Sequence, residues 1–143
     1  MRTLLLIAYS LLCCGLFGQA VEGIYIKGER KGEVHDNGDI YIGGSRKGFI
    51  RSTGGVFING DRLGLISDGE IFYQGYRVGR INMSDGFVYG GDIPKNDKQI
   101  GQIQNDGGIF KDGLKIGHCG SSHFDWTAGI VFFFFRDELL TKE

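Results

Sequence analysis

Short apolar triplets recur along most of the chain at intervals of about sixteen residues. After each triplet come one residue, a glycine, three residues, a second glycine, one further residue and an apolar residue. Six copies are present, with triplets beginning at Ile24, Ile40, Val56, Ile71, Phe87 and Ile109. Each copy is too short for a helix plus a strand and is rich in β-branched and aromatic residues, so we expect two short strands per copy.

The regular glycines indicate where the chain turns. Each copy carries one pair, namely Gly28/Gly32, Gly44/Gly48, Gly60/Gly64, Gly75/Gly79, Gly91/Gly101 and Gly113/Gly117. We predict a three-residue hairpin loop between the two glycines, because glycine accepts the positive φ of a tight turn. Asx-Gly-type sequences such as Asp36-Asn37-Gly38 and Asp68-Gly69 join successive copies and are hairpin signals. The chain is therefore expected to be a meander of hairpins.

The connections between copies suggest how the hairpins assemble. Five Asx-Gly-type connections predict a closed flower- or propeller-like array of about five hairpins, rather than an open sheet with exposed edges. The fifth copy carries an insertion that holds Pro94 and a polar run, 95–99. We expect one all-β domain over 21–135.

The middle residue of each triplet should face away from the first and third, because side chains alternate along a strand. It is aromatic at Tyr25, Tyr41, Phe57, Phe72 and Phe110, and Val88 is the exception. Core packing is our interpretation of this aromatic set, and an aromatic platform for a ligand is the alternative.

The first twenty residues have the layout of a secretory signal peptide. Arg2 precedes an apolar stretch over 4–16, and Gly18-Gln19-Ala20 offers small residues at a cleavage site. The apolar run is too short for a membrane span. We expect cleavage after Ala20, giving a secreted or periplasmic protein with no transmembrane segment. Lipid attachment at Cys13 or Cys14 is the less favoured alternative, because Leu12 or Cys13 would occupy the position of a small residue.

The C-terminal region holds the most apolar run outside the signal peptide. Phe132, Phe133, Phe134 and Phe135 follow Trp126 at short range. A closed array needs something at its centre, so we expect this segment, as a strand or plug, to fill the axis, with Trp126 covering one end. The alternative is an exposed contact for a partner or a membrane surface. Residues 136–143 are expected to form a charged tail.

These features together resemble the bacterial five-fold beta-flower family. The resemblance rests on the signal peptide, the glycine-spaced hairpins and the C-terminal sequence Trp126 to Phe135, and it covers 21–135. The insertion at 92–99 and the charged end at 136–143 depart from it. The resemblance implies a fold and an envelope or secreted setting, and it implies no activity.

Reactive side chains crowd together only at 118–125. His118, Cys119, His123 and Asp125 suggest a nucleophile with its base, or metal ligands. However, Cys119 occupies the position that Val34 and Ile50 hold in other copies, so we interpret it as a small buried apolar residue. We predict no catalytic residue, no metal site and no cofactor. Cys119 would also be the only cysteine left after cleavage, which excludes an intramolecular disulfide.

A basic residue stands midway between the two glycines in five copies, at Arg30, Arg46, Arg62, Arg77 and Lys115. In a meander these positions lie at one end of the array. They define a candidate cationic rim for an anionic partner, although basic residues at hairpin tips also improve solubility and protect strand edges. The overall charge of −1 gives no indication of nucleic-acid binding.

The function expected from the sequence is a non-catalytic structural or interaction protein of the bacterial envelope. Its partner would be an envelope protein or an anionic glycan. The alternative is a module that binds an anionic or sugar-like ligand at the cationic rim. An enzyme is the third class, and it would need the 118–125 cluster to be exposed in a cleft.

Overall fold

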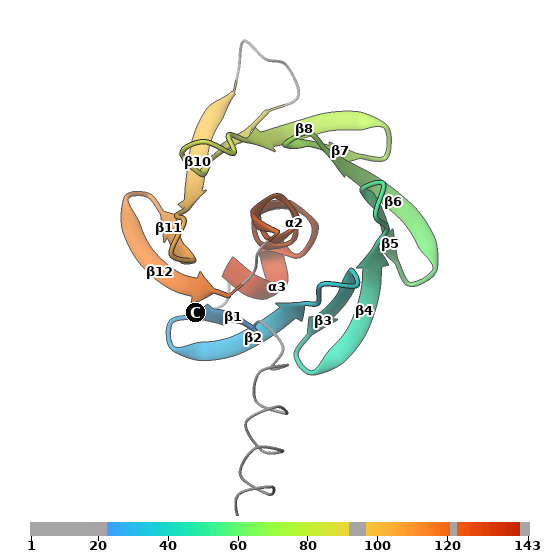
Figure 1. Ribbon diagram of the computed structural model, residues 1–143, viewed down its shortest axis with the longest axis horizontal. Coiled ribbons are helices and arrows are strands. Elements are labelled where there is room, and N and C mark those ends of the chain that lie inside the picture. The colour runs from blue at the N-terminus through green and yellow to red at the C-terminus, as the bar shows by residue number, and fades with distance from the viewer. Residues whose placement is uncertain (1–22, 92–96, 121–122, 141–143) are drawn as a thin grey trace, which may run out of the picture.

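The computed structural model describes residues 23–91, 97–120 and 123–140. Twelve strands form a closed antiparallel barrel in which each strand pairs with its sequence neighbours and β1 pairs with β12 (Figure 1). The strands are β1 (Gly23–Ile26), β2 (Glu29–Val34), β3 (Asp39–Ile42), β4 (Ser45–Ile50), β5 (Gly55–Ile58), β6 (Asp61–Ser67), β7 (Glu70–Tyr73), β8 (Tyr76–Ile81), β9 (Phe87–Gly90), β10 (Lys98–Ile103), β11 (Gly108–Lys111) and β12 (Leu114–Cys119). Three short helical elements follow: α2 (Phe124–Gly129), the π-helix η2 (Ile130–Phe134) and α3 (Arg136–Leu140). The signal peptide expected at 1–20 lies outside the described residues.

The all-β class and the closed array are confirmed, but the ring contains more hairpins than the sequence suggested. Each of the six copies of the pattern forms one hairpin, from β1–β2 to β11–β12. The expectation of about five came from counting connecting turns. Five connecting turns join six hairpins, because the ring closes where β1 pairs with β12 through hydrogen bonds and no connecting turn is needed there.

Five of the six hairpin tips are two-residue turns rather than three-residue loops, and the tip of β9–β10 carries the insertion. In the first hairpin, Lys27 has φ 52° and Gly28 has φ 80°, and β2 starts at Glu29 directly afterwards. Positive φ at both central residues is characteristic of a type I′ turn, whose twist suits a two-residue hairpin. The second glycine of the pair, Gly32, therefore lies inside β2 and not in the turn.

A β-bulge explains why that second glycine faces the barrel interior. Ile24 pairs with Gly32 while Tyr25 pairs with Arg30, so Lys31 is an extra residue in β2. The other five hairpins show the same register shift. The bulge places Gly32 opposite the buried Ile24 and leaves Arg30 beside Tyr25 on the outer wall.

The fifth copy corrects one detail of the sequence analysis. Val88, which is fully buried, pairs with Gly101, as Ile24 pairs with Gly32 in the first copy. The triplet of this copy is therefore displaced by one residue, and Tyr89 takes the outward aromatic position. The insertion hid this displacement, because it changes the spacing between the two glycines.

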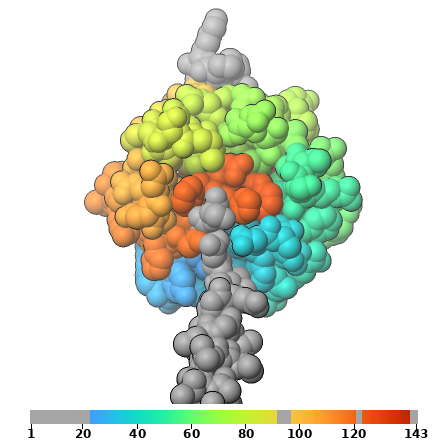
Figure 2. All heavy atoms as spheres, in the orientation of Figure 1, coloured from blue at the N-terminus to red at the C-terminus, as the bar shows by residue number. Residues whose placement is uncertain are grey.

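The C-terminal segment enters the ring as helices and occupies its centre (Figures 1 and 2). A Cβ placed on Gly101, Gly79 or Gly64 would overlap the ring of Phe132, Phe133 or Phe134, respectively. Three consecutive phenylalanines of η2 thus pack against the in-strand glycines of three consecutive hairpins.

The helices also extend the core beyond the expected C-terminal boundary. Phe135 is buried, and α3 adds Leu139, which is 2% exposed. The start of the charged tail expected at 136–143 therefore contributes an apolar side chain to the core. None of the helical elements in the described ranges has the length and apolar character of a membrane span.

Candidate binding surface on the outer wall

The reactive cluster expected at 118–125 is divided among different environments. Cys119 faces the core and is 4% exposed, while His118 stacks on Tyr25 across the β1–β12 junction with ring centroids 4.7 Å apart. His123 instead stacks on Trp126 at 4.2 Å. Adjacent residues of a strand point to opposite faces, so His118 and Cys119 cannot share a site. Within the described ranges, no group of three or more His, Cys, Asp or Glu residues is arranged to hold a metal ion.

The aromatic set lies on the outer wall rather than in the core. All its members are half-buried, namely Tyr25, Tyr41, Phe57, Phe72, Tyr89 and Phe110. Some stack on a side chain of the preceding hairpin: Phe57 on Phe49 with centroids 4.9 Å apart, and Tyr41 on His35 at 4.7 Å. These side chains therefore connect neighbouring hairpins along the surface.

The five basic residues predicted to form a rim stand beside these aromatic residues. Each is the cross-strand partner of one, in the pairs Tyr25–Arg30, Tyr41–Arg46, Phe57–Arg62, Phe72–Arg77 and Phe110–Lys115. They lie within the second strand of each hairpin and not at its tip. Since each belongs to a different hairpin around the ring, they do not converge on one site.

Most of these arginines are neutralised within the protein. Arg30 forms a salt bridge with Glu33 at 3.0 Å, and Arg46 forms one with Asp39 at 2.9 Å. Arg77 binds both Glu70 at 3.2 Å and Asp97 at 3.1 Å. The positive charge expected around the rim is therefore largely compensated at these three positions.

Arg62 and Lys115 lack the acidic partner that Arg46 and Arg77 have within their hairpins, and a comparison of the repeat copies explains this. The acids that pair with Arg46 and Arg77 in the same hairpin, Asp39 and Glu70, are the first residues of β3 and β7. The corresponding first residues of β5 and β11 are glycines, Gly55 and Gly108. Among the described residues, neither Arg62 nor Lys115 forms a salt bridge.

The insertion supplies an anchor that sequence reasoning missed. Both Asp97 oxygens accept hydrogen bonds from Arg77, and Oδ2 also accepts one from Nε of Arg80 at 3.1 Å. Arg80 in turn lies 4.1 Å from the ring centroid of Tyr89. Hydrogen bonding from Arg77 lowers the pKa of the Asp97 carboxyl, against the opposing effect of burial. The end of the insertion is thereby fixed to the β7–β8 hairpin.

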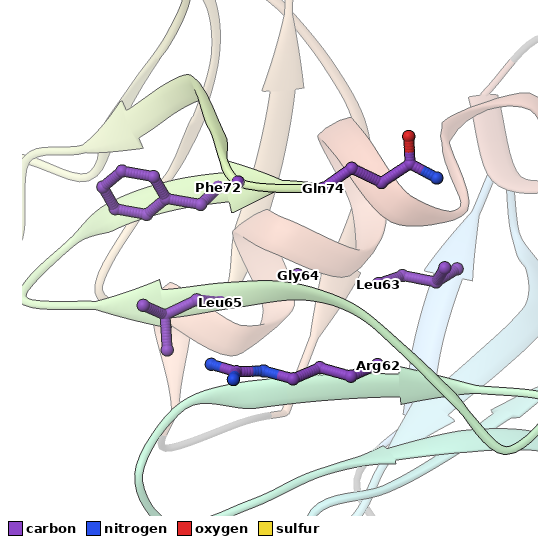
Figure 3. A pocket seen from close by; sticks show the side chains of 7 residues that line it. Arg62, Leu63, Gly64, Leu65, Phe72 and Gln74 are labelled. Atoms are coloured by element: carbon purple, nitrogen blue, oxygen red, sulfur yellow. The ribbon is translucent and has the colours of Figure 1, made fainter.

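A groove of about 440 Å³ lies on the outer wall where β6 meets β7 (Figure 3). Figure 3 shows the side chains of Phe72, Leu65 and Arg62 extending in the same direction, while Gln74 lies towards the other end. The remaining lining residues are Leu63, Gly64 and Gly75. The groove combines an aromatic ring and an aliphatic floor with one cation and one amide.

A second groove of about 290 Å³ occupies the equivalent place between β10 and β11. Phe110 corresponds there to Phe72, but Gln99 replaces Arg62 and Asp112 replaces Gln74. Gln102 also replaces Leu65, so the repeat produces two grooves at equivalent places that differ in charge and in polarity. Sequence reasoning missed both, because each groove forms between two hairpins rather than within one.

Comparisons with family models, with curated proteins and with solved structures give no match for this chain.

Proposed function

We propose that this chain is an exported, non-catalytic interaction protein of the bacterial envelope that presents the outer wall of its barrel to a partner. The observation that carries the proposal is the packed interior. The ring is filled by its own C-terminal helices, with Phe132 and Ile130 almost fully buried. The surface that remains for recognition is the outside of the barrel and its two ends.

The outer wall has features of a recognition surface. Binding sites are usually largely preformed and combine apolar and aromatic side chains with a few placed polar groups. The groove with Phe72, Leu65 and Arg62 has this composition. It is built on paired strands, and strands hold side chains in more precise positions than loops do.

A ligand-binding module for an anionic or sugar-like molecule is the second candidate. It is supported by Arg62, which has no salt bridge among the described residues and lies beside an aromatic ring. This second candidate specifies a ligand class for the interaction surface of the first candidate, because both use the outer wall.

Export belongs to the same proposal. Cleavage after Ala20 would leave every strand intact, because β1 begins at Gly23. The resemblance to the beta-flower family supports an envelope setting. Sequencing the N-terminus of protein recovered outside the cytoplasm should give Val21 as the first residue, and an uncleaved chain confined to the cytoplasm would contradict export.

Site-specific photocrosslinking in the native host tests the interaction role. A photoreactive residue at Leu65 should capture one dominant partner, because Leu65 lines the groove. The same residue at Leu114, which is 71% exposed on another hairpin, serves as the control for random collisions. Identical capture from both positions, or none from either, would contradict the proposal.

A further inference from the structure

We infer that the groove between β6 and β7 is a binding site for a carboxylate-bearing sugar, a hexuronic acid unit of a glycan. The inference rests on the proposed interaction role and names the ligand class for that wall.

The first argument is an uncompensated charge. In the β3–β4 and β7–β8 hairpins, the outward arginine is neutralised by the first residue of the hairpin, Asp39 or Glu70. In the β5–β6 hairpin that residue is Gly55, and no described residue forms a salt bridge with the guanidinium of Arg62. A planar guanidinium binds a carboxylate through two parallel hydrogen bonds. Because the β5–β6 hairpin lacks the acidic side chain present at this position in the other two, the carboxylate of a ligand can bind Arg62 instead.

The charges around the groove favour an anion. Arg51 lies 4.6 Å from the ring centroid of Phe57, which is the cross-strand partner of Arg62. The acid that begins β7, Glu70, is already bound by Arg77 at 3.2 Å. The exposed Asp61 and Asp68, at the two ends of β6, form no salt bridge with Arg62 among the described residues. An incoming carboxylate thus meets Arg62 with its donors available.

The floor of the groove suits a sugar ring. A pyranose has an apolar face of C–H groups and a polar edge of hydroxyls, and Phe72 with Leu65 offers an apolar surface for that face. Gln74 contributes an amide that can donate to and accept from hydroxyls. The volume of about 440 Å³ falls in the range of small-molecule sites, roughly 300–1,000 Å³.

The closed ring disfavours a peptide as the ligand. Extended peptides commonly bind by adding a strand to an exposed sheet edge. Here β6 and β7 are hydrogen-bonded to each other across the floor of the groove, and every strand of the barrel has two neighbours. The groove therefore offers side chains to a ligand and no free strand edge.

The second groove provides an internal comparison. It has the corresponding aromatic ring in Phe110, but Gln99 stands in place of Arg62, Gln102 stands in place of Leu65 and Asp112 adds a negative charge. An acidic sugar should therefore select the β6–β7 groove over the β10–β11 groove.

Calorimetric titration of the mature chain with tetragalacturonate, at low and at physiological salt, tests the assignment. We expect saturable binding that Arg62→Gln weakens about tenfold or more, because a hydrogen-bonded charged contact is lost. Arg46→Gln is the matched control: it removes the same charge from the equivalent position of the neighbouring hairpin, where Asp39 already neutralises it. Its affinity should stay within about twofold of the wild-type value, as for contacts outside the site.

Gly55→Asp provides a second test with little risk to folding. A Cβ at Gly55 would meet Phe57 at 3.4 Å and Arg62 at 3.7 Å, which are ordinary contacts. The new carboxylate should neutralise Arg62, as Asp39 does for Arg46, and abolish binding. Unchanged thermal melting of each variant shows that the fold is retained.

Several results would overturn the assignment. Absence of tetragalacturonate binding, equal losses in Arg62→Gln and Arg46→Gln, or full affinity in Gly55→Asp would each do so. Equal binding of neutral galactotetraose would refute the carboxylate contact, and equal binding of tetraglutamate would refute the sugar. These failures concern the ligand class alone, whereas crosslinking from Leu65 decides separately whether the wall has a partner.

Discussion

The two glycines of each repeat serve different purposes. Gly28 lies in a turn with φ 80° and has open space where a side chain would stand. Gly101, in contrast, is a strand residue with a close neighbour, because the ring of Phe132 occupies the space of its missing side chain. The first glycine is needed for the positive φ of the turn, and the second is needed because the core leaves no space for a Cβ atom.

Gly101→Ala should therefore destabilise the protein by about 1–3 kcal/mol, the usual cost of overpacking a core. Gly55→Ala is the control, since Gly55 is also a buried strand glycine but a Cβ there would meet only side-chain atoms, at 3.4 Å or more, and its effect should stay within about 0.5 kcal/mol. Urea denaturation measures both changes in the free energy of unfolding. Adding Phe132→Leu should recover part of the loss from Gly101→Ala, because the two side chains compete for one space. Equal losses in the two glycine variants would contradict this packing role.

At the scale of elements, two segments that depart from the repeat are held by the wall in different ways. The C-terminal helices fit by shape, with phenylalanines of η2 packed on glycines. The insertion is held by charge, with Asp97 bound to Arg77 and Arg80. The side chain of Asp97 is 9% exposed, and a buried charge is tolerated only when it is paired.

The Asp97 anchor predicts a pH dependence. The pKa of Asp97 is lower in the folded protein than its ordinary value, so the folded state binds its proton less readily than the unfolded state does. The stabilisation by Asp97 is therefore complete above about pH 4, the ordinary range of an aspartate, and is lost as the pH falls through the lower folded value. Asp97→Asn should reduce the free energy of unfolding at pH 7.

Chemical denaturation of Asp97→Asn and wild type across acidic pH measures this effect. The difference between them should shrink as the pH falls, because wild-type Asp97 becomes protonated. Asp112→Asn, at an exposed aspartate in a hairpin turn, is the matched control and should show no such convergence. A constant difference between Asp97→Asn and wild type at all pH values would refute the anchor.

At the scale of the whole molecule, ring closure removes the sheet edges. Lys27 N–H donates to the carbonyl of Ile116 at 2.8 Å, and Ile24 pairs with Cys119 in the same junction. Unpaired strand edges are sites of aggregation, and only full closure eliminates them. The β1–β12 junction should therefore be as well protected as the rest of the wall.

Amide hydrogen exchange followed by NMR checks this expectation. Amides that are hydrogen-bonded across the β1–β12 junction should exchange as slowly as those between β5 and β6, because exchange rates report local opening. The turn amide of Gly60 provides an exposed reference that exchanges rapidly. Fast exchange confined to β1 and β12 would show an open sheet instead of a closed barrel.

Much of the fold follows from sequence pattern. The triplets led by Ile24 and Ile40, and the glycine spacing, predicted strands and turns because side-chain alternation and positive φ are local properties. Local pattern also predicted a buried Cys119. It failed at Val88, where the insertion displaced the register, and it left the secondary structure of Phe132–Phe135 open, because an apolar run is compatible with either a strand or a buried helix.

The sequence by itself determined an all-β chain of short hairpins in a closed array. Only the tertiary structure decided that six hairpins close the ring, that helices fill it, and that Arg62 lacks the acid that its counterpart Arg46 has. These features depend on contacts between residues far apart in the chain, such as Ile24 with Cys119 or Arg77 with Asp97. A local pattern fixes the direction in which a side chain points, whereas closure of the ring fixes what it meets there.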